Sequence, residues 1–260
     1  MAEKETKNNP KDMIEAVPEE TEVLEKLVET QLEREKRLEH ERVKFSLDSW
    51  TPKTKLGIDV RAGKEKDIDK ILKTGKKILE PEIVDKLLSL ESDLLLIGQA
   101  KGKFGGGKRR AWRQTQKKTK EGNVLSFSAM AVVGDKKGHI GIGYGKARET
   151  LPAREKAIRN AKLNVVKIIR GFESPENEPE GAIPHTVPFK IEGRSGSVRI
   201  TLLPAPRGTG LVAGGECKKI LKLAGIKDIY TQTRGKTKTT FNLAKACIEA
   251  LIKTTKMEKQ

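Results

Sequence analysis

Cysteine and histidine are scarce in this sequence of 260 residues, which holds two cysteines and three histidines. Cys217 and Cys247 do not form a CxxC pair, so the sequence lacks the signature of a zinc site. No serine or cysteine stands with a histidine and an acid at the spacing of a known catalytic triad. We interpret both cysteines as buried free thiols in a reducing compartment, and we expect no enzyme activity, cofactor or small-molecule substrate.

Long apolar runs are also missing. No stretch approaches the about 18 consecutive apolar residues that a transmembrane helix needs. The first ten residues are polar, with two glutamates and two lysines, and lack the basic start and apolar middle of a signal peptide. We therefore expect a cytoplasmic protein that binds no membrane.

Positive charge is abundant but unevenly placed. The formal net charge is +17, yet residues 1–50 hold 9 Lys or Arg against 14 Asp or Glu, a net of −5. The rest of the chain holds 44 basic and 22 acidic residues, a net of +22. A body of this charge favours a polyanion as its partner, because each phosphate that a cation neutralises releases counterions.

The spacing of apolar residues predicts an α+β protein with four parts. Residues 1–49 form an acidic, partly disordered extension with a helix at 21–45, and residues 50–91 a linker with short helices at 67–72 and 81–90. Residues 92–172 form a first domain and residues 183–255 a second.

The first domain has the predicted order helix–strand–strand–strand–helix, with one face of the sheet covered. Its clearest strands are 123–134 and 139–144, joined by a turn at 135–138. The following helix begins near Thr150 and is expected to continue until Gly171, because alanine, valine and isoleucine recur every four residues.

The second domain follows an acidic, proline-containing stretch at 173–180. Alternation predicts strands at 187–191 and 197–203, joined by a turn at 192–196. A helix at 214–224, a short strand at 226–230 and a last helix at 240–252 complete this domain.

A basic stretch at 101–120 contains nine cations and no acidic residue. Its core is KRRAWR, in which Arg109, Arg110 and Arg113 surround Trp112. Guanidinium groups bind phosphate in two-point fashion, and an indole can stack on an unpaired base. These residues predict contact with RNA or DNA, and the alternative is a solvated basic loop.

Two glycine-rich segments imitate nucleotide-binding motifs. In GHIGIGYG, residues 138–145, the glycines alternate within a strand, where they allow another backbone or a sugar–phosphate chain to approach closely. Residues 102–108 match a phosphate-binding loop, but Arg109 stands where that motif needs Ser or Thr. We therefore predict no dinucleotide or ATP site.

Two further segments lead into helices and are candidates for anion binding. Residues 204–215, PAPRGTGLVAGG, join a strand to a helix start, and residues 234–240, RGKTKTT, precede the last helix. Free N–H groups and the helix dipole attract anions at such positions. The alternatives are a tight connection in the first case and a solvated loop in the second.

Three long runs carry a family resemblance: AVVGDKKGHIGIGYGKARE (131–149), PHTVPFKIEGRSGSVRITLLPAPRGTG (184–210) and LAGIKDIYTQTRGKTKTT (223–240). Together with WTPKTKLG (50–57), they resemble the universal small-subunit ribosomal protein "S five" family in its archaeal/eukaryotic form. The resemblance covers about residues 50–255.

The resemblance implies a first domain similar to a double-stranded-RNA-binding module and a second domain with a left-handed βαβ crossover. It also implies contacts with small-subunit ribosomal RNA and neighbouring ribosomal proteins, near the side where messenger RNA enters, and an effect on decoding accuracy. RNA contacts are implied at Lys117, Lys118, Lys120, Lys137, His139, Lys146, Arg207, Thr209, Arg234 and Lys236, and a protein contact at Lys218. From the residues alone, His139 and His185 are interpreted as ordinary core or surface histidines.

Two alternatives stay open on the sequence. A free-standing RNA chaperone shares the charge and the first domain but does not need residues 184–255 in this form. An RNA-processing or nucleotide-dependent enzyme needs a magnesium-binding Ser or Thr after Lys108, or a cluster of carboxylates, and the sequence shows neither.

Overall fold

The computed structural model describes residues 47–99, 109–173 and 183–257, and its main compact unit is Pro52–Gln260. The helix predicted at 21–45 lies outside the described residues, as do the loop at 100–108 and most of the acidic stretch at 173–180. Three consecutive glycines and repelling cations predict that the loop at 101–113 becomes ordered only when RNA binds, and most of this loop also lies outside the described residues.

Three short helices open the compact unit: α2 (Lys55–Arg61), α3 (Ile68–Thr74) and α4 (Pro81–Leu87). The two later helices were predicted, and Pro81 stands in the first turn of its helix. The first helix was missed, because residues 50–57 were taken as an extended linker. It begins there because the Thr54 hydroxyl accepts a hydrogen bond from the Gly57 N–H at 3.1 Å and so caps the helix.

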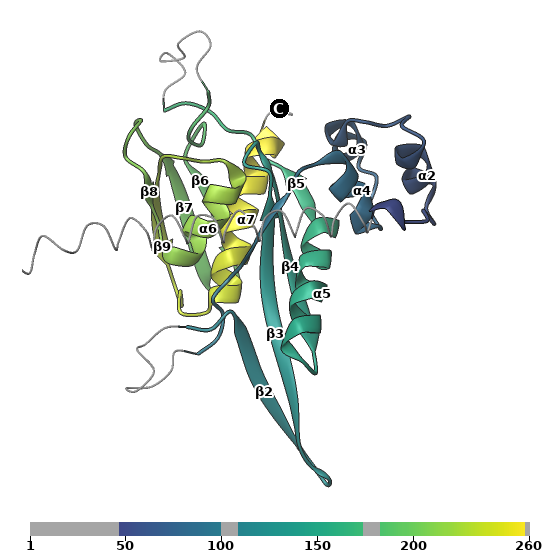
Figure 1. The fold of residues 1–260 in the computed structure, drawn as a ribbon. Coiled ribbons are helices and arrows are strands. Elements are labelled where there is room, and N and C mark those ends of the chain that lie inside the picture. Colours follow the sequence, from purple (N-terminus) through teal and green to yellow (C-terminus); the bar gives the residue numbers. More distant parts are fainter. Residues whose placement is uncertain (1–46, 100–108, 174–182, 258–260) are drawn as a thin grey trace, which may run out of the picture. The chain divides into compact units, whose positions relative to one another are not determined.

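The first sheet is antiparallel and has the order β1-β3-β4-β5, with β2 also paired to β3. Its strands are β1 (Glu91–Leu94), β2 (Trp112–Thr119), β3 (Gly122–Gly134), β4 (His139–Ala147) and β5 (Val165–Lys167). The strand β1 pairs with the end of β3 and β2 with its beginning. Beyond the residues of β3 that also pair with β4, the hairpin of β2 and β3 projects from the body as a two-stranded arm, residues 115–126 (Figure 1).

The helix α5 (Thr150–Leu163) packs against this sheet at the alternating glycines of β4. A β-carbon added at Gly143 would lie 2.1 Å from the carbonyl oxygen of Ala157. The corresponding distances are 2.2 Å from Gly141 to Ala161 and from Gly145 to Ala153. The prediction that these glycines admit a close backbone is confirmed, and that backbone is the helix α5.

The helix α5 ends at Leu163, not at Gly171 as predicted. Asn164 ends the helix, and the chain continues as the strand β5, which pairs with β4. Val165 belongs to the four-residue apolar series on which the prediction rested. That series could not distinguish a longer helix from a helix followed by a buried strand, and branched side chains such as Val165 and Val166 fit the strand.

The second sheet has the order β6-β7-β9-β8. Its strands are β6 (Ile191–Ser195), β7 (Val198–Pro204), β8 (Leu211–Val212) and β9 (Ile229–Arg234). The helix α6 (Gly215–Ala224) connects β8 to β9, which run parallel, and α7 (Thr240–Met257) follows β9. This is the βαβ crossover that the resemblance implies, and its left-handed turn stays a prediction.

The first strand of this sheet is displaced from its predicted position of 187–191. The strand contains Gly193, which was placed in the turn. A β-carbon at Gly193 would lie 2.1 Å from the carbonyl oxygen of Ala246 in α7, so glycine is needed here for helix packing. The turn itself is shorter and contains Gly196, with a φ of +60°.

The two sheets share one hydrophobic core, and α6 and α7 lie between them (Figure 1). Met130 and Val132 of the first sheet join Ile220 and Leu221 of α6 in this core. The other face of the first sheet packs against α5 through a smaller alanine cluster. Both faces of the first sheet are thus covered, not one as predicted, while the second sheet keeps its outer face in solvent. Both cysteines are free and buried, as predicted.

Candidate nucleic-acid interface

The arm carries its cations into solvent. All residues of β2 after Trp112 are exposed, including Arg113, Lys117 and Lys118, and Lys120 lies exposed in the turn at the tip. The ladder between β2 and β3 is the arm's main support, because no core covers either of its faces. Two-stranded hairpins of this kind are only marginally stable alone. The arm is therefore suited to lie against a partner.

A row of side chains crosses the base of the arm. Arg113 of β2 and Lys146 of β4 are both paired with Ser128 of β3. Residues directly opposite one another in antiparallel strands share a face of the sheet. The sheet therefore brings together two cations that are 33 positions apart in the sequence.

Trp112 contacts cations of its own chain. Its ring centroid lies 5.8 Å from the guanidinium carbon of Arg110 and 5.0 Å from that of Arg154. These are cation–π distances, and they hold a half-buried indole between basic groups. Base stacking by Trp112 stays a prediction, now with two guanidinium groups beside the ring.

Three arginines stand side by side on the outer face of the second sheet. Arg194 of β6 is opposite Arg199 of β7, and Arg199 is opposite Arg234 of β9. All three are exposed, and no acidic side chain is ion-paired to them among the described residues. We call them the arginine row. Like charges directly opposite one another destabilise a sheet, so this row needs an anionic partner to be favourable.

Of these three arginines, only Arg234 was predicted as a site residue from the sequence. The signal for the others was present, because Arg194 and Arg199 flank the short turn at Gly196 and both point away from the helices. The displaced prediction for β6 put Arg194 in a turn. Without the correct register, its position beside Arg199 could not be found.

His139 is held within the chain on both sides of its ring. Nδ1 lies 2.6 Å from Asp135 Oδ2, and Nε2 lies 2.8 Å from Asp69 Oδ1. The hydrogen bond to Asp135 is the main reason why the pKa of His139 is raised above its usual value. The predicted RNA contact of His139 therefore has no free ring nitrogen, and the geometry favours a structural role that joins α3 to the turn between β3 and β4.

Both carboxylates that face His139 have a lowered pKa. Burial acts in the opposite direction on each of them. For Asp135 it is outweighed by hydrogen bonds from His139 and from the Lys137 and His139 backbones. For Asp69 it is outweighed by its pairing with Lys167 and His139. The turn is therefore held by a network of His139 and two carboxylates, and the exposed Lys137 is part of this turn through its backbone N–H, which donates to Asp135.

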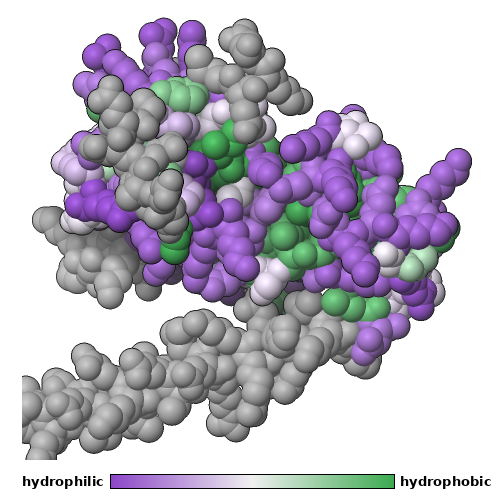
Figure 2. All heavy atoms as spheres, turned by 90° about the horizontal axis from the view of Figure 1, so that it is seen from above, coloured by the Kyte–Doolittle hydropathy of each residue, from purple (hydrophilic) through white to green (hydrophobic). Residues whose placement is uncertain are grey.

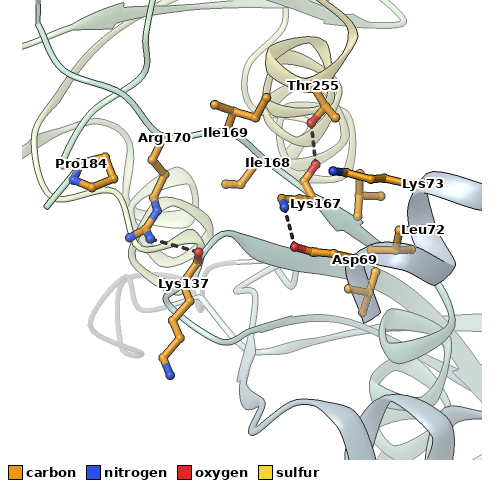
Figure 3. A pocket seen from close by; sticks show the side chains of 12 residues that line it. Asp69, Leu72, Lys73, Lys137, Lys167, Ile168, Ile169, Arg170, Pro184 and Thr255 are labelled. Carbon is orange, nitrogen blue, oxygen red and sulfur yellow. Dashed lines mark hydrogen bonds and ion pairs between the residues drawn. The ribbon is translucent and has the colours of Figure 1, made fainter. Parts of the chain in front are cut away.

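A cavity of about 470 Å³ adjoins this turn, between α3, β5 and the end of α7. Lys73, Lys137, Lys167 and Arg170 line it together with apolar residues such as Ile169. Figure 3 shows Lys167 directed at Asp69 and Arg170 at the backbone of Lys137, while the Lys137 side chain extends away from both pairs. Two of its four cations are thus used to hold the fold.

The PAPRGTG turn, residues 204–210, connects the end of β7 to the start of β8. Arg207 is exposed, and the Thr209 hydroxyl donates to the Pro206 carbonyl at 2.8 Å, which closes the turn. Asp228 accepts a hydrogen bond from the Gly210 N–H at 2.8 Å. His185 is buried beside Asp228, and neither of its ring nitrogens has a hydrogen-bond partner within the described parts of the chain. These contacts explain how the turn is held.

The predicted site residues consequently separate into two groups. The lower end of Figure 1 is where the arm projects and α7 begins, and the upper end is where α7 ends. The lower group is Arg109, Arg110, Trp112, Arg113, Lys117, Lys118, Lys120, Lys146, Arg234 and Lys236, with Lys218 exposed in the first turns of α6. The upper group is Lys137, His139, Arg207 and Thr209. Figure 2, which views the upper end, shows mostly hydrophilic residues with apolar ones between them.

Within the described residues, no group of three or more His, Cys, Asp or Glu side chains could hold a metal ion. In the same part of the chain, no helix is long and apolar enough to cross a membrane.

Comparison with known proteins identifies the family. Residues 111–169 match the family described as ribosomal protein S5, N-terminal domain, and residues 193–260 match ribosomal protein S5, C-terminal domain. A small ribosomal subunit protein uS5 of Nanoarchaeum equitans is 49% identical over 209 residues, which are 80% of this chain and 89% of that relative. The chain belongs to the ribosomal protein S5 family.

Other archaeal members of the S5 family give the same result. The uS5 protein of Methanocaldococcus jannaschii is 44% identical over 80% of this chain and 89% of its own length. That of Staphylothermus marinus is 44% identical over 82% of this chain and 92% of its own length. The resemblance noted in the sequence is confirmed, including its archaeal form. The two family matches include the whole arm and the whole arginine row.

Proposed function

We propose that this chain is a structural, non-enzymatic component of the small ribosomal subunit in the cytoplasm, and that it binds ribosomal RNA through its lower end. The arginine row is the observation that carries the proposal. Cross-strand like charges cost stability, and a line of phosphates reverses that cost by neutralising them. The names of the archaeal relatives indicate which polyanion this is.

The arm extends the same surface. Lys117, Lys118 and Lys120 are exposed along it, with no core to shield them from a strand of RNA. Their contacts are to phosphates, which position the protein without reading sequence. Arg109, Arg110, Arg113 and Trp112 stand where the arm joins the body and add guanidinium and ring contacts. In this proposal the first domain, 92–172, supplies the arm and the second, 183–255, supplies the arginine row.

The upper end of the molecule is proposed to make separate contacts within the ribosomal subunit. Lys137, Arg207 and Thr209 contact RNA or a neighbouring ribosomal protein there, while His139 holds the turn that carries Lys137. Lys218 on α6 contacts a neighbouring protein. By family resemblance, the assembled protein lies near the side where messenger RNA enters and affects decoding accuracy.

Co-sedimentation with the small ribosomal subunit through a high-salt gradient tests the proposal. Screening weakens each phosphate contact steeply, so retention of one copy per subunit requires integral assembly. Replacing Arg194 and Arg199 by glutamine should release the protein at a lower salt concentration. The control replaces Lys227 and Lys245, two exposed lysines outside the row, by glutamine. This control protein should be released at the same salt concentration as the native chain.

Other outcomes identify the alternatives. Release of the native chain at high salt, with binding to any duplex RNA alike, would indicate a free-standing RNA chaperone. Magnesium-dependent or ATP-dependent RNA turnover by the pure protein would indicate an enzyme. Either result would overturn the structural proposal.

A further inference from the structure

Two segments that the sequence marked separately as anion-attracting come together in the structure. Because β8 and β9 run parallel, the helices that follow them, α6 and α7, begin at the same end of the sheet (Figure 1). A cavity of about 270 Å³ lies between the two helix starts. Its lining includes Gly214, Gly215, Thr237, Lys238 and Thr240. Arg109, the first described residue after position 108, also lines it. We call it the two-helix pocket.

The start of α6 supplies free hydrogen-bond donors. Its cap residue, Gly214, has no side chain that could accept from the first turn. The backbone N–H groups of Gly215, Glu216 and Cys217 make no hydrogen bond to any described residue. A β-carbon at Gly214 or Gly215 would meet nothing within 4 Å, so a ligand can approach this backbone closely.

Thr240 is the second, independent feature of the pocket. It lines the cavity at the start of α7, although the residue is only 7% exposed. Its hydroxyl makes no hydrogen bond to any described residue, so it is available to a ligand in the cavity. A ligand oxygen in the pocket would supply a hydrogen-bond partner.

The charges around the pocket favour an anion. Arg109 and Lys238 are exposed, and neither is ion-paired to a described carboxylate. Glu216 is the one carboxylate in the lining, and its Oε2 accepts a hydrogen bond from the Leu96 N–H at 2.8 Å. Two cations and the positive ends of two helix dipoles therefore stand against one carboxylate that is already in use.

A second hollow of about 390 Å³ shares Gly214, Thr237 and Leu243 with the two-helix pocket. Its other lining residues are uncharged and include Val212, Thr231 and Thr233. A charged cavity beside an uncharged, hydroxyl-lined one matches a nucleotide, with a phosphate in the first and its sugar in the second. In the sequence, the exposed Lys236 stands between Arg234 of the arginine row and the lining residue Thr237.

We propose that the two-helix pocket binds one phosphate of a ribosomal RNA strand and that the adjoining hollow takes the attached ribose. This inference rests on the proposed function and assigns it a specific phosphate-binding site. Arg109, Lys238 and the first turn of α6 hold the phosphate oxygens, and the Thr240 hydroxyl donates to one of them.

The test is an NMR titration of the full chain labelled with ¹⁵N. Three probes are used: a single-stranded RNA hexanucleotide, the same hexanucleotide with uncharged methylphosphonate linkages, and inorganic phosphate. The RNA should shift the amide signals of Gly215 and Glu216 in a saturable way, and the methylphosphonate form should not. Lys238→Gln should weaken this binding about five- to tenfold, because it removes a charged partner of the phosphate. Lys245→Gln, an equal charge change on the same helix outside the pocket, should leave it unchanged.

Thr240→Val keeps the side-chain shape and removes the hydroxyl, so it should also weaken the binding. If this buried substitution unfolds the chain, Lys238→Gln still decides the question, because Lys238 is exposed. Shifts with inorganic phosphate but not with RNA would overturn the inference in favour of a free-anion site. Equal weakening of RNA binding in Lys238→Gln and Lys245→Gln would also overturn the inference, because the binding would then depend only on the overall charge of the chain. Retention on the small subunit in either case would leave the proposed function standing.

Discussion

Replacing Gly143 by alanine tests how α5 is held against the first sheet. The added β-carbon would lie 2.1 Å from the Ala157 carbonyl oxygen, 2.2 Å from the Ala161 nitrogen and 2.7 Å from the Asn160 carbonyl carbon. All three are backbone atoms of one helix, so no side chain can rotate away to make room. Relief requires α5 to move outwards by roughly 1 Å, which loosens its contacts along the whole face of the sheet.

The expected cost follows from these distances. Overpacking a core costs about 1–3 kcal/mol, and a clash with three backbone atoms belongs at the upper limit. Alanine also restricts the unfolded chain, which returns about 0.4–1 kcal/mol. The net destabilisation should be about 2 kcal/mol or more, equivalent to a fall in Tm of roughly 4–8 °C for a chain of this size.

Urea denaturation and thermal melting of the full chain measure this change. Gly215→Ala is the matched control, because its β-carbon meets nothing within 4 Å and it stands in the first turn of a helix. That variant should be neutral or stabilised by up to about 1 kcal/mol. If Gly143→Ala melts within about 2 °C of the native chain, then α5 does not lie at this distance and the account of the glycines is wrong.

Three further outcomes are expected. The pKa of His139 is raised above its usual 6.5, so its charge contributes stability that is complete below pH 6.5 and is lost as pH rises through the folded-state pKa. The difference in unfolding free energy between the native chain and His139→Gln should therefore be largest near about pH 6 and shrink towards about pH 9, and a constant difference in urea titrations would contradict the network. Arg199→Gln relieves cross-strand repulsion and should raise stability by about 0.2–1 kcal/mol while weakening RNA binding, and a loss of both would show that the arginine row is structural. Lys117→Gln and Lys118→Gln on the arm should each lower the slope of log affinity against log salt by about 0.7–0.9 without changing the urea midpoint, and an unchanged slope would remove the arm from the interface.

Much of the interface could be predicted from local patterns. Arg109, Arg113, Lys117 and Lys118 were found because charge clusters in the sequence, and the family followed from three long runs. The register of the strands was harder to predict than the position of the charges. Gly193 resembled a turn residue, so β6 was misplaced and Arg194 was not recognised as a partner of Arg199. The end of α5 was missed because Val165 fits a helix and a buried strand equally well.

Composition and local patterns were enough to predict the charge of the body, the type of most elements, the glycines that admit a close neighbour and the family to which the chain belongs. These features depend on composition and on residues a few positions apart, where backbone geometry repeats. Only the tertiary structure decided which distant residues meet. It placed His139 against Asp69 and lined up three arginines across neighbouring strands. It also brought Arg109 to the starts of α6 and α7. Such pairings depend on strand register and on how the helices pack over a shared core, and no local pattern of residues contains that information.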